Sequence, residues 1–359
     1  MKFYYNLQSL IYLLIIFMMC SAAYGQSKLL VDDGPYIFLE KGGYVVKMIH
    51  QNKLKSKHYD EDTPTEYSNL NFPLHLREPL VSDNQAIYHG VSKIAAISDI
   101  HGQYDVMIKL FQVNGIVDQN NQWLFGDGHL VITGDIFDRG DQVTEILWYI
   151  YELEEQARQA GGQVHFLLGN HELMILEGDT RYIHKKYRYT MALTNMLYHQ
   201  LFSPNTVLGQ WMRTKNISIR INDIVFVHGG FSNRVLDYGI DLDSLNQVFR
   251  KELIDKPLGA IKKDNTLSDL YFEEGPLWYR GYASENFTEN DADEVLAGLE
   301  CDHIVVGHTS MESIVSLFED KIIFIDSSIK FGKKGEILFW EEGLFKKGDI
   351  FGAKMNLAD

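Results

Sequence analysis

Residues 94–102 read Ile-Ala-Ala-Ile-Ser-Asp-Ile-His-Gly, and this stretch decides the fold. Its apolar start has no polar alternation, which predicts a short strand buried on both faces. Asp99 and His101 follow the strand directly and, being two residues apart, point to the same side of an extended chain. A carboxylate and an imidazole at this place indicate a ligand site at the carboxyl edge of a sheet.

The same arrangement recurs along the chain. Five short apolar runs, rich in Ile, Val and Leu, are each followed by residues that can bind a metal. The runs are Ile94–Ile97, Leu130–Thr133, Val164–Leu168, Ile224–Val227 and Ile304–Val306. The polar residues after them are Asp99 and His101, Asp135, Asn170 and His171, His228, and His308. Because ligands bind where strands of an open α/β sheet end, we expect these side chains to meet at one site.

Helix-like segments separate the apolar runs. Periodic apolar residues predict helices over Tyr104–Val113, Gln142–Ala160 and Ala292–Leu299. This alternation predicts an α/β core with mainly parallel pairing. Two late apolar segments, Ile322–Asp326 and Ile337–Trp340, are expected to be strands that close a second sheet.

The chain divides into a leader, an arm, a main domain and a tail. Residues 1–25 are typical of a signal peptide, 26–90 of an N-terminal hairpin and arm, 91–345 of the main domain, and 346–359 of a tail. The hairpin is expected over 34–50 around Gly42-Gly43, with an irregular arm over 51–75. Within the main domain, 173–223 is expected to be a helical insertion, either a cap on the core or a lid that selects substrates.

The first residues indicate export to the periplasm or secretion. Lys2 precedes the apolar run Leu10–Met19, which is too short to span a bilayer, and Ala23 and Gly25 suit a cleavage site. The alternative is a retained N-terminal anchor; after cleavage no stable membrane anchor is expected.

Charge and cysteine content exclude two classes of function. The net charge of −16 argues against nucleic acid as a partner, because such binding needs clustered Lys and Arg. Beyond the leader Cys301 is the only cysteine, so no internal disulfide is possible. A cysteine-dependent phosphatase needs an Arg six positions after its Cys, where this chain has Gly307. Cys301 is therefore expected to be a small core residue.

The chemistry of the six candidate ligands favours borderline metals. Imidazole nitrogens combined with carboxylate and amide oxygens suit Mn, Fe or Zn. No thiolate is offered, which argues against a structural zinc site.

The ordered motifs carry a family resemblance. They are Asp99-x-His101, Gly134-Asp135-x-x-Asp138-Arg139-Gly140, Gly169-Asn170-His171-Glu172, His228-Gly229-Gly230 and Gly307-His308. This series resembles the phosphoprotein phosphatases within the calcineurin-like metallophosphoesterases. The leader, residues 134–140 and the segment Gly-Pro-Leu-Trp-Tyr-Arg-Gly at 275–281 look most like the bacterial Shewanella-like protein phosphatases. Residues 325–330 depart from the Ser-Ala-Pro-Asn-Tyr-Cys loop of the eukaryotic enzymes, so substrate preference is not carried over.

The resemblance implies a fold and a dinuclear metal centre. The fold is a metallophosphoesterase-type β-sandwich core with flanking helices. The first of two divalent or transition metal ions would be held by Asp99, His101 and Asp135. The second would be held by Asp135, Asn170, His228 and His308, so that Asp135 bridges the two ions.

The resemblance also implies roles in catalysis. A hydroxide bridging the metals would attack phosphorus in line. His171 would protonate the leaving oxygen as general acid, oriented by Asp138. Arg139 and Arg280 would bind the phosphoryl oxygens, and Glu172 would brace the loop.

Three functions stay open on the sequence. The first is a phosphatase for phosphorylated protein, peptide or a small phosphomonoester, with phosphotyrosine as a plausible target. The second is a symmetrical dinucleoside tetraphosphate hydrolase, which shares these motifs but acts on intracellular substrates. The third is a non-catalytic metal- or phosphate-binding surface protein, which would usually have lost ligands or the acid.

Overall fold

The computed structural model describes residues 30–60, 70, 72, 74–77 and 85–357. The expected signal peptide, 1–25, lies outside these residues. Among the helices of the described part, none has both the length and the apolar character needed to cross a bilayer.

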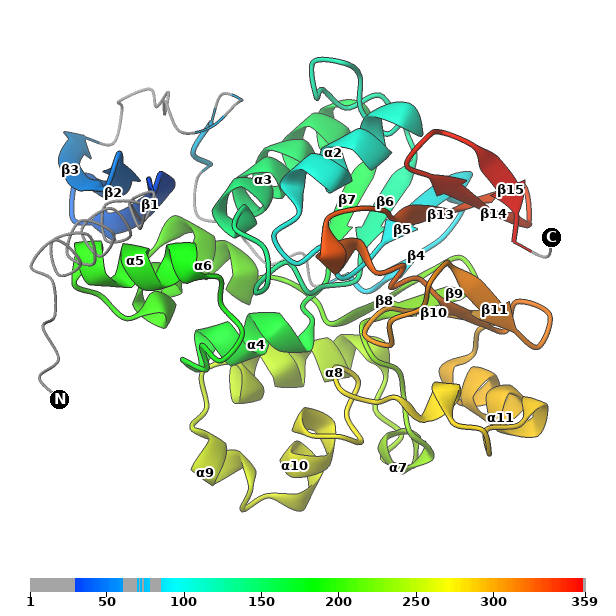
Figure 1. Cartoon of the computed structure of the whole chain (residues 1–359). Helices are drawn as coiled ribbons and strands as arrows, with labels where there is room; N and C mark the ends of the chain where they lie inside the picture. Colours follow the sequence, from blue (N-terminus) through cyan, green and yellow to red (C-terminus); the bar gives the residue numbers. More distant parts are fainter. Residues whose placement is uncertain (1–29, 61–69, 71, 73, 78–84, 358–359) are drawn as a thin grey trace, which may run out of the picture.

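Two six-stranded sheets form a sandwich (Figure 1). One sheet has the order β15 (Lys354–Asn356), β14 (Leu344–Asp349), β13 (Glu336–Glu341), β5 (Lys93–Ile97), β6 (His129–Ile132) and β7 (Gln163–Phe166). The other has the order β11 (Val315–Leu317), β12 (Ile322–Phe324), β10 (His303–Val306), β9 (Ile224–Val227), β8 (Ser218–Ile221) and β4 (Ile87–Tyr88). Pairing is parallel through β5–β6–β7 and β9–β10–β12, as predicted for the core.

The central strands are buried on both faces, which explains their continuous apolar runs. In β5, Ile94 and Ala96 pack between the two sheets, whereas Ala95 and Ile97 belong to the core under the helices. Helices α2 (Tyr104–Val113) and α3 (Val143–Gln159) cover the β5–β6–β7 sheet. Each matches its prediction to within one residue.

The described residues form eight further α-helices outside the two sheets. They are α4 (Asn170–Leu176), α5 (Lys185–Thr194), α6 (Val207–Arg213), α7 (Asn233–Leu236), α8 (Leu242–Val248), α9 (Leu258–Ile261), α10 (Asn265–Tyr271) and α11 (Glu289–Leu299). Short 3-10 turns are η1 (Tyr198–Phe202), η3 (Gly281–Ala283) and η4 (Ile329–Phe331), and η2 (Phe249–Leu253) is a π turn. Helix α11 begins three residues before its predicted start because Thr288 caps it.

The N-terminal arm is more regular than predicted. The hairpin is present as β1 (Asp33–Glu40) and β2 (Gly43–His50), but a third strand, β3 (Lys53–Asp60), pairs with β2 where an irregular arm was expected. The side chains of β3 are nearly all exposed. A solvent-exposed edge strand needs no apolar alternation, so its polar sequence concealed it.

Two further expectations were wrong, and one was right only in part. The insertion, 173–223, is mostly helical as far as α6, as expected, but its last segment, β8, forms a hairpin with β9; the alternating Ile217, Ile219 and Ile221 carried that signal. Strands β12 and β13 lie in different sheets and do not close one together. The tail does not start at residue 346, because β14 crosses that boundary and pairs with β13.

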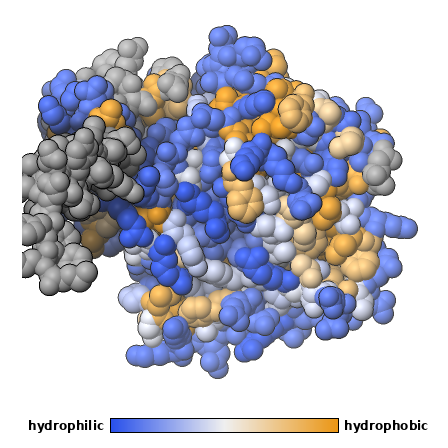
Figure 2. All heavy atoms as spheres, viewed as in Figure 1, coloured by the Kyte–Doolittle hydropathy of each residue, from blue (hydrophilic) through white to orange (hydrophobic). Residues whose placement is uncertain are grey.

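The surface agrees with this layered core. On the face shown in Figure 2, hydrophilic residues cover most of the described surface and hydrophobic residues form separate groups. Cys301 is buried, as predicted, and burial raises the pKa of its thiol to about 12. A thiol with so high a pKa is a packing group and a poor nucleophile.

Candidate metal centre

The six predicted ligands lie on loops that follow five strands. Asp99 and His101 follow β5, Asp135 follows β6, and His228 and His308 follow β9 and β10. Asn170 begins α4, after β7. All six are buried, with at most 5% of their surface exposed. The carboxyl edges of both sheets therefore meet in one polar cluster.

The loops hold several of these residues in strained backbone conformations. Asp99, His101, Asp135 and His308 all have positive φ, between 46° and 60°. This left-handed region costs about 1–2 kcal/mol per non-glycine residue. Strain of this kind persists at functional sites, where the surrounding structure fixes the geometry.

Two glycines let carboxylates enter the cluster. A Cβ at Gly169 would stand 2.3 Å from Asp135 Oδ1, and one at Gly307 would stand 2.6 Å from Asp99 Oδ2. Any larger residue would displace a carboxylate oxygen. The glycines of these two motifs are therefore needed for close packing at the site.

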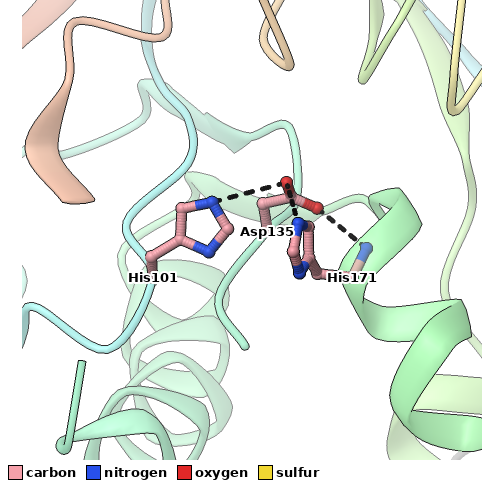
Figure 3. Close-up of side chains that lie close together, drawn as sticks. All are labelled: His101, Asp135 and His171. Atoms are coloured by element: carbon pink, nitrogen blue, oxygen red, sulfur yellow. Dashed lines mark hydrogen bonds and ion pairs between the residues drawn. The ribbon is translucent and has the colours of Figure 1, made fainter. Parts of the chain in front are cut away.

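Asp135 contacts both His101 and His171 (Figure 3) and also lies close to His228. Its Oδ2 is 3.6 Å from His101 Nε2 and 3.8 Å from His171 Nε2, and its Oδ1 is 3.3 Å from His228 Nε2. Burial alone would raise the pKa of Asp135, but the adjacent His228 and His171 hold it well below its usual range. Asp135 is thus a carboxylate within reach of three imidazoles.

The ligand atoms fall into two groups that share Asp135. His101, Asp135 and His171 form one group, and Asp135, His228 and His308 form the other, with the ligand atoms of each within 4.8 Å of one another. Two ligands of one ion, each about 2.1 Å from it, lie roughly 3–4 Å apart. The spacing fits two neighbouring metal ions.

Hydrogen bonds fix the imidazole rings for metal binding. His101 Nδ1 is 2.6 Å from the Phe137 carbonyl oxygen, and His228 Nδ1 is 2.8 Å from that of Thr133. Donation to a carbonyl places the proton on Nδ1 and leaves Nε2 free to face the cluster. Metal-binding histidines are usually held in this way.

Asp99 and Asn170 complete the cluster. Asp99 Oδ1 is 3.8 Å from His101 Nε2, while its Oδ2 accepts a hydrogen bond from the His308 main-chain N–H at 2.9 Å. Asn170 Oδ1 is 2.9 Å from His228 Nε2. Burial, and then the negative charges of Asp326 and Asp135, raise the pKa of Asp99 well above its usual value. A cation would relieve that repulsion, so the donor set fits the metals that the sequence predicts.

His171 and Asp138, which the resemblance implies as general acid and orienting residue, are hydrogen-bonded to each other. His171 Nδ1 and Asp138 Oδ2 make a short hydrogen bond, and the other carboxylate oxygen of Asp138 has no partner among the described residues. Burial would lower the pKa of His171, but Asp135 and the bond to Asp138 raise it above its usual value. His171 also stands in the first ligand group, although the sequence assigned it proton transfer.

The two arginines lie at different sides of the cluster. Arg139 is exposed and follows Asp138, and its main-chain N–H donates to the Tyr182 carbonyl at 3.0 Å. Arg280 Nη1 donates to the His308 carbonyl at 2.7 Å, and its Nη2 is 3.5 Å from His308 Nδ1. Arg280 therefore stands beside His308, whereas the guanidinium of Arg139 lies over the ring of Tyr182 and acts electrostatically on Asp138.

Glu172 braces the central loop, as predicted. Its Oε2 accepts from the main-chain N–H of Asp135 at 2.8 Å and of Gly169 at 2.7 Å, and its Oε1 accepts from that of Ile136 at 2.8 Å. A fully buried carboxylate thus ties the loop after β6 to the start of α4.

Sequence reasoning missed two residues near the cluster. Asp326 is fully buried, accepts from Ser310 and Ser328, and acts electrostatically on Asp99. It follows the apolar run of β12, so the rule that found the six candidate ligands pointed to this position as well. Tyr182 lies next to His171, and only the fold brings it there, because the insertion has no strand-end pattern.

Known proteins resemble this chain over most of its length. The Calcineurin-like phosphoesterase family matches residues 92–311. An uncharacterised protein of Schizosaccharomyces pombe is 31% identical over 258 residues, covering 68% of this chain and 75% of that protein. Shewanella-like protein phosphatase 2 of Arabidopsis thaliana is 25% identical over 301 residues, covering 69% and 74%. The crystal structure of a cold-active protein-tyrosine phosphatase from a psychrophilic Shewanella species is 42% identical, covers 91% of this chain and 99% of that one, and superposes with a TM-score of 0.84.

Proposed function

The chain belongs to the calcineurin-like phosphoesterase family and is a hydrolase of phosphate monoesters, and we propose that its substrates are phosphotyrosine residues of proteins and peptides. The observation that carries this proposal is its similarity, along nearly the whole chain, to a structure described as a protein-tyrosine phosphatase. A small aryl phosphomonoester is expected to serve as well, whereas nucleic acid is not.

The buried acid pair supports catalysis over mere binding. His171 is held by Asp138, and its Nε2 faces Asp135. This nitrogen is therefore placed to give a proton to the leaving-group oxygen of a phosphate ester bound at the cluster. A proton donor beside the departing oxygen serves cleavage of the ester bond, whereas phosphate binding alone does not require a histidine oriented by a buried carboxylate.

The metals and the arginines have separate tasks in this proposal. Two ions, Mn, Fe or Zn, would lower the pKa of water towards about 7 when bound by the six ligands. Arg139 and Arg280 would bind the phosphoryl oxygens and orient the ester bond towards His171. His171 would then protonate the departing phenolate oxygen, with Asp138 holding the charged ring in place.

A panel of matched phosphopeptides tests the proposal. Peptides of one sequence carrying phosphotyrosine, phosphoserine or phosphothreonine are incubated with the protein in Mn²⁺, and again after chelation. We expect kcat/KM for phosphotyrosine to exceed the other two by at least about tenfold, loss of turnover after chelation, and recovery with Mn²⁺. A preference for phosphoserine, for a dinucleoside tetraphosphate included as a fourth substrate, or undiminished turnover by demonstrably metal-free protein would refute it.

We also propose that the protein is exported to the periplasm or secreted. The support is the basic and apolar composition of residues 1–25, followed by small residues. Fractionation of cells expressing the full chain should place the phosphatase outside the cytoplasm, while a chain that starts at residue 26 should stay inside. Equal distribution of the two chains would contradict export.

A further inference from the structure

Tyr182 is an exposed aromatic residue next to the buried acid pair. Its ring centroid is 5.7 Å from that of His171, and 47% of its surface is exposed, whereas His171 is 5% exposed. Its carbonyl accepts the Arg139 main-chain N–H at 3.0 Å. The insertion therefore places a large apolar ring beside the two residues that would meet the leaving group and the phosphoryl group.

Charged neighbours hold this ring in place without burying it. The guanidinium carbons of Arg139 and Arg181 lie 5.9 Å and 5.4 Å from the Tyr182 centroid. Arg181 is itself tied to Asp179, with its Nε 3.0 Å and 2.9 Å from the two carboxylate oxygens. An exposed ring that two guanidinium groups over it keep ordered suits contact with a bound molecule, because little freedom is lost on binding.

We propose that Tyr182 is the contact surface for the aromatic ring of phosphotyrosine, an inference that rests on the proposed function. A general acid must stand about 3 Å from the leaving oxygen. The phenyl ring attached to that oxygen then reaches Tyr182, whereas phosphoserine has only one carbon between its oxygen and the main chain. Pairing of two aromatic rings contributes about a twofold to twelvefold gain in binding. Tyr182 thereby favours aryl over alkyl phosphates.

Two phosphonates test the contact without relying on catalysis. Phenylphosphonate and methylphosphonate share a head group and differ by the ring, and calorimetry measures their binding to Mn²⁺-loaded protein. In Tyr182→Ala we expect phenylphosphonate to bind about threefold to tenfold more weakly, with methylphosphonate changed less than about twofold. Tyr182→Phe should bind both as the wild type does. Tyr189→Ala, at a tyrosine of α5 that is 51% exposed, is the matched control and should change neither.

The kinetic counterpart uses the phosphotyrosine and phosphoserine peptides. Tyr182→Ala should lower kcat/KM about threefold to tenfold for phosphotyrosine and leave phosphoserine hydrolysis within about twofold. Equal losses on both phosphonates would mean that Tyr182 acts by positioning Arg139 or His171, and no loss would mean no contact; either result overturns the inference. A different result would refute only the proposed substrate: the wild-type protein does not hydrolyse the phosphotyrosine peptide, yet it binds phenylphosphonate more tightly than Tyr182→Ala does.

Discussion

The two ligand groups that share Asp135 differ in one respect: both imidazole rings of one group are held by main-chain carbonyls, whereas the other group has one ring held by a carbonyl and one held by a carboxylate. Three rings are fixed by main-chain carbonyls: His101 by Phe137, His228 by Thr133, and His308, through Nε2, by Trp278 at 3.1 Å. The fourth, His171, is fixed by the Asp138 carboxylate. A carbonyl leaves an imidazole neutral, as a metal ligand must be, whereas a carboxylate favours the protonated ring.

The electrostatics of the four rings follow this difference. Burial lowers the pKa of His101 to about 3, and burial together with the nearby His228 and Arg280 lowers that of His308 to about 2. The pKa of His171 is raised instead. His228 is the exception among the carbonyl-held rings: burial would lower its pKa, but Asp135 raises it to about 9. A cation between His228 and Asp135 would displace that proton, so we expect three of the rings to act as metal ligands and His171 to act as an acid.

The largest effect is expected where both groups depend on one residue. Asp135→Asn removes the charge that the two groups share, so we expect both ions to be lost and kcat/KM to fall by at least about 10³-fold. Elemental analysis measures the metal content, and an aryl phosphatase assay measures kcat/KM. Asp141→Asn, at an exposed aspartate on the same loop, is the control. Two retained ions with normal turnover would end the idea of a shared carboxylate.

A second substitution tests whether His171 is an acid or a ligand. His171→Asn should lower kcat/KM on phosphotyrosine by about 10²–10⁴-fold while the protein keeps two metal ions. The loss should be smaller with p-nitrophenyl phosphate, whose leaving group needs less help from a proton. His308→Asn should instead lower the metal content. If His171→Asn also lost an ion, His171 would belong with the ligands.

A smaller effect is expected from Glu172, which ties the loop of Asp135 to the start of α4. Glu172→Gln keeps the shape of the side chain. In the wild type, main-chain N–H groups donate to both carboxylate oxygens, and in the variant an NH₂ group would face some of these donors. We expect metal affinity or activity to fall about 10- to 100-fold, as for other residues that support metal ligands. Metal titration measures this loss. Unchanged affinity would show that the loop after β6 holds Asp135 unaided.

The smallest effect concerns the far end of the helix that carries His171. Burial raises the pKa of Glu177, which is hydrogen-bonded to Tyr271, to about 7. Because this folded-state pKa exceeds the unfolded value near 4.5, the contribution to stability is complete below about pH 4.5 and is lost as pH rises through 7. After allowance for partial exposure, we expect a loss on the order of 1 kcal/mol.

Glu177→Gln tests this pH dependence against a neutral isostere. Urea unfolding at pH 5 and pH 8 should show a smaller difference in the free energy of unfolding for Glu177→Gln than for the wild type. Equal differences in the two proteins would mean that the carboxyl group is already ionised in the fold at pH 5. Phosphatase activity at one pH serves as the control for an intact site.

The sequence by itself determined the core and the chemistry of the site. Continuous apolar runs are unavoidable in strands buried on both faces, and a polar residue after each run is a local signal, so Asp99, Asp135 and His308 could be found without the fold. The same local rule would have found Asp326. The exposed strand β3 escaped because water imposes no apolar pattern on an edge.

Only the tertiary structure decided what surrounds those residues. It put Tyr182 of the insertion beside His171, and strands β12 and β13 into different sheets. These placements depend on how distant segments pack. Which distant segments pack together is set by the shapes and directions of whole elements, and the local apolar pattern does not encode it.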